Sequence, residues 1–418
     1  MARTPPPAGR PLRLAVAGLG AVAQAVHLPL ISRRPDLFEL VSVFDVSPAL
    51  REQVSRRFGV PAARQHASLE AMLDADPVDA VMILTGGSHA PAVVEAFARG
   101  YPVFCEKPLA FTEAEVDQIE AAAPPGRAAP LFLGYMKQYD PAVTEAVRLL
   151  AGIGEIRAVE VTVLHPTGAS QLEIAHLVPF AHDAPGPEAA AERDRVMHRA
   201  ALGDQEDAVN RLYSGALLSS LAHDLSLLRL MTGPPAEIGY VDVWTATPSA
   251  TRRAVGRDVR ALGEHPPSIT IAGRLPGRAR VVMHWHYLAD YPAYRETVTV
   301  HHGAGSLELV FPSPYLLHAP TRLTVVDEAG GFERRSAHRS VGEAFEIQLE
   351  AFYAMVTEGR APLSSIADGR TDVVTCQQIM SCYAARAGFR LGGEAARVMT
   401  RPAGAPARPA PTITGGNA

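Results

Sequence analysis

Two side chains stand out for the chemistry they could perform. Of the 39 lysine and arginine residues in this 418-residue chain, only Lys107 and Lys137 are lysines. Either residue can provide a surface cation, but only the lysine ammonium has a pKa that its surroundings can shift far enough for proton exchange. Both lysines are therefore candidate functional residues, Lys107 for catalysis and Lys137 for substrate. The alternative is that they survive by chance in an arginine-biased chain.

A second candidate for proton transfer is His223, because the unperturbed pKa of imidazole lies near neutrality. The residues around it, Gly215 to Met231, are strongly apolar and are expected to form a helix. Ser219 and Ser226 fall on the same helical face as His223, so this polar stripe is either satisfied within the helix or lines a substrate site. Asp224 follows about 100° around the helix and is a further substrate candidate. The alternative for His223 is a core histidine bonded to a backbone group.

The N-terminal region carries a candidate phosphate-binding turn. The apolar stretch LRLAVAG is followed by Gly-Leu-Gly-Ala-Val-Ala and then by a helical pattern, the order that a dinucleotide fingerprint requires. The first glycine permits a tight turn, the second lets the backbone approach a pyrophosphate, and the final alanine lets the helix pack closely. Glycine-rich turns also occur simply to reverse the chain. The candidate cofactor contacts in this turn are Gly18, Leu19, Gly20, Ala21 and Val22.

Asp45 supports the dinucleotide interpretation of this turn. It ends the next expected strand, about 20 residues beyond the glycines, where a carboxylate can accept hydrogen bonds from ribose hydroxyls. This predicts NAD as the cofactor, with NADP as the second possibility. The alternative is that Asp45 caps the following helix, although Ser47 with Pro48 after it can fill that role.

These residues need a parallel sheet to position them. From Leu12 to about Pro130, short apolar strands alternate with helical patterns, which indicates a sheet covered on both faces. After a helix at Pro141 to Leu150, long strands joined by tight turns indicate antiparallel pairing. The predicted fold is α/β, an N-terminal Rossmann domain followed by an α+β domain with a large, mostly antiparallel sheet. The expected ranges are a tail (1–11), the Rossmann domain (12–134), the α+β domain (135–395) with an insertion over the sheet (166–213), and a tail (396–418).

Four segments together resemble the Gfo/Idh/MocA family of oxidoreductases. They are GLGAVAQAVHLPL, VDAVMILTGGSHAPAVVEAFARGYPVFCEKPLAFT, GYMKQYDPAV and GALLSSLAHDLSLLRLMTG. The resemblance implies a catalytic lysine in a Glu-Lys-Pro motif, here Glu106 to Pro108, and a substrate held between the two domains. A proline in this motif can adopt a cis peptide bond and aim the lysine toward the substrate.

The resemblance also carries over further cofactor contacts by position. These are Thr85, His89, Glu106 and Lys107. His89 could equally be an ordinary residue at a helix N-terminus. The chain departs from the family where an aspartate commonly precedes the histidine by four residues, because Ser219 stands there. This departure affects the proton relay that the resemblance implies between that aspartate and His223.

Composition narrows the classes of partner. The net charge of −5 and the dispersed arginines give no basic stripe, so neither nucleic acid nor a membrane surface is expected as a partner. No apolar run is long enough to span a membrane, and the N-terminus lacks the apolar core of a signal peptide, so a cytoplasmic location is expected. The three cysteines are too few for a disulfide framework. His284 and His286 share a strand face but are too few to bind a metal ion, so no metal is expected.

Three functions are compatible with these features. The leading expectation is an NAD(P)-dependent dehydrogenase or reductase that acts on a secondary alcohol of a sugar, cyclitol or related polyhydroxylated small molecule, and that forms a homo-oligomer through the C-terminal sheet. One alternative retains the cofactor and uses transient oxidation to assist elimination or glycosidic cleavage. The other is a dinucleotide-dependent sensor without catalytic activity.

Overall fold

The computed structural model describes residues 9–398 except 76, 125–129, 179–182, 184–185, 245–266 and 289–290. Most of the two expected tails therefore lies outside the described residues. Gly9 and Arg10 are held in place, because the Gly9 N–H donates to the Tyr353 hydroxyl and Arg10 pairs with Asp79 at 2.8 Å. At the other end, α13 (Ala395–Val398) buries Val398, so ordered chain extends past residue 395.

The N-terminal half forms a six-stranded parallel sheet in the order β3-β2-β1-β4-β5-β6, the strand order of a Rossmann fold. Its strands are β1 (Leu12–Ala17), β2 (Phe38–Phe44), β3 (Gln65–His66), β4 (Ala80–Ile83), β5 (Val103–Glu106) and β6 (Leu131–Gly134). All residues of β4 and β5 are buried, as expected for strands covered on both faces. The expectation of a parallel N-terminal sheet is confirmed.

Helices alternate with these strands along the chain. They are α1 (Leu28–Arg33), α2 (Pro48–Phe58), α3 (Leu69–Ala75), α4 (Ala90–Ala98) and α5 (Glu113–Ala122). Between the glycine-rich turn and α1 lies a π-helical segment, Ala23–His27. The start of α2 is capped by Ser47, whose hydroxyl accepts from the Leu50 N–H at 3.1 Å. The Ser47-Pro48 pattern therefore sets the first residue of this helix.

The second sheet has eight strands in the order β14-β13-β12-β11-β7-β10-β9-β8. They are β7 (Ile156–His165), β8 (Glu237–Trp244), β9 (Ser268–Arg274), β10 (Arg280–Tyr287), β11 (Arg295–His302), β12 (Gly305–Phe311), β13 (Arg322–Ala329) and β14 (Phe332–Arg339). The β7–β10 pair is parallel and the other described pairs are antiparallel, which confirms the expected mostly antiparallel sheet.

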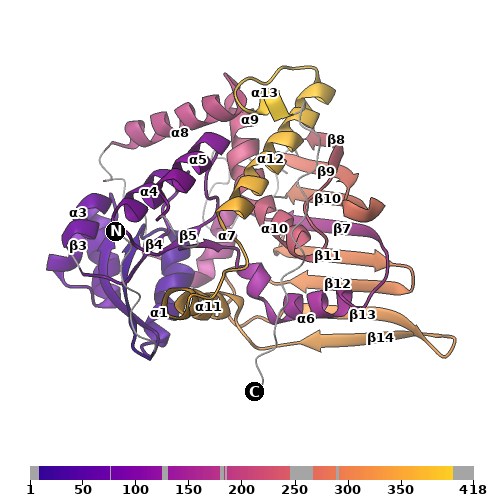
Figure 1. The fold of residues 1–418 in the computed structure, drawn as a ribbon, viewed down its shortest axis with the longest axis horizontal. Helices are drawn as coiled ribbons and strands as arrows, with labels where there is room; N and C mark the ends of the chain where they lie inside the picture. Colours follow the sequence, from indigo (N-terminus) through magenta and orange to yellow (C-terminus); the bar gives the residue numbers. More distant parts are fainter. Residues whose placement is uncertain are drawn as a thin grey trace.

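Further helices lie along the second sheet or beside the Rossmann domain (Figure 1). They are α6 (Pro141–Leu150), α7 (Gly168–Leu172), α8 (Pro187–Leu202), α9 (Asp207–Arg211), α10 (Ala222–Met231), α11 (Ala344–Glu358) and α12 (Ile366–Ala387). Helix α6 packs on β12, β13 and β14, and α12 packs on β8. Helix α11 instead completes the Rossmann core, since the Phe352 ring lies 5.5 Å from that of Phe104 on β5.

Two sequence expectations need correction. The segment Gly215 to Met231 is not one continuous α-helix, because Leu212–Leu221 is π-helical and α10 begins only at Ala222. The insertion lies only partly against the antiparallel sheet: Ser313 after β12 donates to Gln171 on α7 at 3.4 Å, whereas α8 runs beside α4 and α5 (Figure 1). His198 on α8 stacks on Phe111 of the Rossmann domain with ring centroids 5.4 Å apart.

Candidate active site

The glycine-rich turn has the geometry that close approach of a phosphate requires. Gly18 has a φ of +94°, and a Cβ on it would lie 2.7 Å from the backbone of Leu84, so no other residue fits there. Gly20 differs, since a Cβ there would meet nothing within 4 Å. The space beside Gly20 therefore fits a pyrophosphate at the start of the following helix. This observation supports a dinucleotide at the turn.

Asp45 lies directly against this turn. Its carboxylate accepts hydrogen bonds from the Leu19 N–H at 2.8 Å and the Ser47 N–H at 2.9 Å. Ser47, and not Asp45, caps α2. The capping alternative is thus wrong, and contact between Asp45 and an adenosine ribose stays a prediction.

The Glu106-Lys107-Pro108 motif follows β5 at the carboxyl edge of the parallel sheet, where open α/β sheets place their ligands. The Lys107–Pro108 peptide bond is cis, as the sequence suggested. The Glu106 carboxylate pairs with His27 Nε2 at 2.9 Å and also accepts from the Lys107 N–H at 3.2 Å. Burial alone would raise the pKa of Glu106, but the contact with His27 holds it below its usual value. The sequence reasoning missed His27, which lies 79 residues away from its partner.

The Lys107 side chain reaches from the Rossmann domain to the helical segment that precedes α10. Its Nζ donates to the carbonyl oxygen of Ser219 at 2.7 Å. Burial and the nearby Lys137 ammonium lower the pKa of Lys107, while the Glu106 carboxylate opposes the shift. A lysine in this environment can hold or release a proton at a lower pH than an exposed one.

Two of the expected cofactor contacts hold the turns around Lys107 together. His89 is buried, and its Nδ1 lies 2.6 Å from the Pro108 carbonyl oxygen and its Nε2 2.6 Å from that of Thr85. Each ring nitrogen faces a carbonyl oxygen, and burial lowers the pKa of the imidazole although these two contacts oppose the shift. His89 joins the turn after β4 to the turn after β5. Its direct contact with a cofactor stays a prediction.

His223 lies at the start of α10, edge-on to the Tyr135 ring at 5.8 Å. It keeps partial exposure, whereas the following Asp224 is 1% exposed. Its Nδ1 is buried without a hydrogen-bond partner among the described residues. Burial, together with the charges of Lys107 and Lys137, lowers the pKa of His223 well below its usual value. The imidazole is therefore neutral at physiological pH.

The serine hydroxyls expected beside His223 are satisfied within their own helical segments. Ser219 Oγ donates to the Ser214 carbonyl at 2.6 Å, and Ser226 Oγ donates to that of His223 at 2.7 Å. Internal satisfaction is thus observed for the two serines of the polar stripe, whereas His223 Nδ1 has no partner among the described residues. Ser219 still faces Lys107, but through its carbonyl oxygen.

Lys137 forms the centre of a buried charged cluster. Its ammonium pairs with Glu296 on β11, which also accepts from the Tyr294 hydroxyl. The Glu296 side chain is fully buried and that of Lys137 is 8% exposed. Burial and the Glu296 charge raise the pKa of Asp224 well above its usual value, which favours the neutral carboxyl form of Asp224. The alternation of β11 could have revealed Glu296, since it buries this residue on the same face as Val298.

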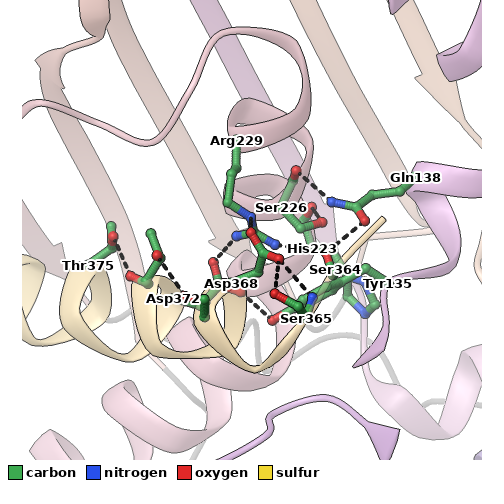
Figure 2. A network of polar contacts seen from close by, with 12 residues as sticks. Tyr135, Gln138, His223, Ser226, Arg229, Ser364, Ser365, Asp368, Asp372 and Thr375 are labelled. Carbon is green, nitrogen blue, oxygen red and sulfur yellow. Dashed lines mark hydrogen bonds and ion pairs between the residues drawn. The ribbon is translucent and has the colours of Figure 1, made fainter. Parts of the chain in front are cut away.

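A second network anchors α10 to α12 (Figure 2). Arg229 on α10 pairs with Asp372 and, at 3.1 Å, with Asp368, both on α12. The Tyr135 hydroxyl donates to Asp372 at 2.6 Å, which places the ring that contacts His223. Burial raises the pKa of Asp372 to about 6 despite the Arg229 charge. The network fixes α10, and with it His223, against the neighbouring elements.

Comparison with known proteins identifies the N-terminal domain. Residues 12–128 match the model of an oxidoreductase family with an NAD-binding Rossmann fold, the Gfo/Idh/MocA family. Over these residues the N-terminal domain is similar to the Gfo/Idh/MocA oxidoreductases. The expected resemblance and the expected nicotinamide dinucleotide are thereby confirmed. This family match does not extend to the antiparallel sheet.

Individual relatives agree with this assignment. The chain is 28% identical over 244 residues to an inositol 2-dehydrogenase of Ralstonia nicotianae, which covers 58% of this chain and 60% of that protein. Matches to the first curated relatives span 40% to 60% of the length of those proteins. The structure of myo-inositol 2-dehydrogenase from Lactobacillus plantarum superimposes with a TM-score of 0.63 at 19% identity, covering 92% of this chain and all of that one. An aldose-aldose oxidoreductase from Caulobacter crescentus gives the same TM-score and coverage at 20% identity. These two likenesses show the fold of both domains.

The described residues contain neither a membrane-spanning helix nor a metal-binding cluster. No described helix combines the length and apolar character needed to cross a membrane. Within the same residues, no three histidine, cysteine, aspartate or glutamate side chains gather as metal ligands would. All three cysteines are free thiols, with Cys105 and Cys376 buried.

Proposed function

We propose that this Gfo/Idh/MocA oxidoreductase transfers a hydride between NAD and a secondary alcohol or ketone of a polyhydroxylated small molecule, such as a sugar or a cyclitol. The observation that carries the proposal is the placement of Lys107. Its amine follows the carboxyl end of β5, its pKa is lowered by burial, and it bridges to the segment leading into His223. The proton-handling groups thus lie at the sheet edge used for cofactor binding.

The role of Lys107 follows from charge balance. Bound NAD supplies the hydride acceptor. When the carbinol C–H bond breaks and its hydride leaves, the hydroxyl proton must pass to a base. The neutral Lys107 amine accepts that proton during oxidation and returns it from the ammonium during reduction. His223 is the second proton-handling group in this proposal, and its neutral imidazole would relay the proton between its two nitrogens.

The polar groups around Lys107 support a polyhydroxylated substrate. His223 Nδ1 is buried without a hydrogen-bond partner, and such an atom costs free energy until a ligand or water pairs with it. The carboxyl pair of Asp224 and Glu296 and the ammonium of Lys137 add both acceptors and donors nearby. Several hydroxyl groups on one molecule would match this variety of partners. We assign Lys137 and Asp224 to the substrate side on this basis.

The cofactor proposal is NAD in preference to NADP. The Asp45 carboxylate can accept hydrogen bonds from the ribose hydroxyls of NAD, whereas it would repel a 2′-phosphate. Titration with both dinucleotides tests this preference. Equal or tighter binding of NADP would contradict it.

The test of the activity is a screen of sugars and cyclitols with NAD, monitored by absorbance of the reduced nicotinamide. Net reduction of NAD that is lost in Lys107→Met supports the proposal. Conversion of a substrate without net NAD reduction would instead favour retained cofactor and transient oxidation. Binding without any turnover would favour a sensor.

We also propose a homo-oligomer formed through the outer face of the eight-stranded sheet. Large apolar side chains are exposed on its two edge strands, Tyr240 at 38% and Trp244 at 39% on β8 and Phe332 at 77% on β14. Light scattering on the purified protein measures its mass directly. A monomer at micromolar concentration would contradict this proposal.

A further inference from the structure

A carboxylate from the insertion lies on the Rossmann domain at the start of α2. Asp183 belongs to the stretch 166–213, which has no counterpart in the segments that resemble the family. One Asp183 carboxylate oxygen accepts a hydrogen bond from the Ala49 N–H at 2.8 Å, and the other accepts from the Ser47 hydroxyl. Close by, the Val178 N–H donates to the side chain of Gln24 at 2.9 Å, so the insertion contacts the Rossmann domain at a second point.

The position that Asp183 takes is one that an anion would otherwise occupy. The first N–H groups of a helix have no partner within the helix and carry a partial positive charge. Asp183 satisfies one of them and also binds the capping residue Ser47. These contacts hold the pKa of Asp183 below its usual value, so the carboxylate is charged at neutral pH. The start of α2 is thus already paired with a negative charge.

This position adjoins the expected adenosine ribose site. Ser47, which donates its hydroxyl to Asp183, donates its backbone N–H to Asp45 at 2.9 Å. Arg51, one turn into α2, donates to the Asp45 carbonyl oxygen and lies close enough to Asp183 to influence its charge. In Rossmann domains that use NADP, an arginine near this place accommodates the 2′-phosphate. Here Arg51 faces a carboxylate that already offsets its charge.

We propose that Asp183 is a specificity-determining residue that excludes the 2′-phosphate of NADP by placing its own carboxylate at the start of α2, beside Asp45 and Arg51. The proposal rests on the NAD preference given under Proposed function. It adds that the preference is set by two carboxylates from separate parts of the chain, one of them from the insertion. NAD has a hydroxyl in place of the 2′-phosphate and meets no such repulsion.

Equilibrium titration of the purified full-length protein with NAD and with NADP, without substrate, tests this assignment. Asp183→Asn removes the charge and retains an oxygen acceptor, and Asp183→Ala removes both. Asp183 is exposed, so neither substitution disturbs the core. The matched control is Glu192→Gln on α8, which removes one negative charge from the same insertion at an exposed ion pair with Arg195.

The expected result in both Asp183 variants is an NADP Kd lower by about tenfold, since one like charge at close range is removed. The NAD Kd should stay within about threefold, and Glu192→Gln should change neither Kd by more than about twofold. The gain in NADP affinity should be smaller at high salt, because salt screens the charge repulsion that the substitution removes.

The ratio of the two Kd values in the unaltered protein tests the NAD preference alone, and the change in that ratio tests Asp183. A protein that prefers NAD, with an NADP Kd unchanged in Asp183→Asn and Asp183→Ala, would overturn the role of Asp183 and leave the preference standing. A protein that binds NADP at least as tightly as NAD would overturn the preference itself. An equal gain in NADP affinity in Glu192→Gln would also overturn the assignment, because the gain would then come from the net charge of the protein alone.

Discussion

Replacement of Lys137 by methionine is expected to destabilise the protein strongly. The substitution removes the cation from the fully buried Glu296 carboxylate, which then lies beside Asp224 and still accepts from the Tyr294 hydroxyl. Breaking a buried ion pair by removing one partner costs about 3–5 kcal/mol, because the remaining charge stays uncompensated. For a domain of roughly 250 residues, this corresponds to a decrease in Tm of about 6–10 °C.

The magnitude can be separated from the effect of packing with a second substitution. Glu296→Gln added to Lys137→Met removes the stranded charge, so the double variant should regain about 1–3 kcal/mol relative to Lys137→Met alone. The loss in Lys137→Met should also shrink as the pH is lowered, because protonation neutralises the unpaired carboxyl groups. Urea unfolding followed by circular dichroism measures each free energy of unfolding.

A surface ion pair provides the control. Glu333 and Arg335 on β14 pair at 2.7 Å with 61% and 68% of their side chains exposed, so Glu333→Gln should cost no more than about 0.5 kcal/mol. The reasoning would be refuted if Lys137→Met cost as little as this control. It would equally be refuted if Glu296→Gln added a further loss in place of a recovery.

Other predictions follow from single residues. Lys107→Arg should nearly abolish turnover while cofactor affinity stays within about tenfold, because the charge is kept but the shiftable proton donor is lost; retained turnover would restrict Lys107 to positioning. His223→Asn should lower kcat by roughly 10² to 10⁴ with dinucleotide affinity unchanged, whereas a lower Tm with normal kcat would indicate a structural histidine. Gly20→Ala should weaken NAD binding without lowering the free energy of unfolding. Gly18→Ala should lower both the NAD affinity and the free energy of unfolding, because a Cβ on Gly18 meets the backbone of Leu84. Equal unfolding curves for the two variants would contradict this. Burial raises the pKa of Asp372 from 3.8 to about 6. The contribution of Asp372 to the free energy of unfolding is therefore full below pH 3.8 and is lost as the pH rises through about 6. The free energy of unfolding relative to Asp372→Asn should therefore increase from about pH 7 to about pH 4, and a decrease would reverse the assigned shift.

Local sequence signals predicted the elements whose boundaries are set by local chemistry. The Ser47-Pro48 pattern gave the first residue of α2, and the glycine-rich turn gave the end of β1. The Glu-Lys-Pro motif placed Lys107 at the carboxyl end of β5, with the cis peptide bond. Each of these features depends on residues close together in the chain, so one sequence is sufficient to predict them.

Features that depend on distant contacts were not predicted. The pairing of His27 with Glu106 and that of Lys137 with Glu296 join residues 79 and 159 positions apart. Nothing local specifies the π-helical segment before α10, which altered the expected serine stripe. The insertion carries few apolar side chains to indicate a packing partner, so its contact with α2 through Asp183 appears only in three dimensions. The burial of Glu296 could have been predicted, because the alternation of β11 places it on the same face as Val298.

The most direct test of the account is a stoichiometric turnover measurement with NAD and the best substrate from the sugar and cyclitol screen. The account predicts one reduced nicotinamide for each secondary alcohol oxidised to a ketone, at a rate that Lys107→Met abolishes. Product formation without accumulation of reduced nicotinamide, or full activity in Lys107→Met, would contradict it.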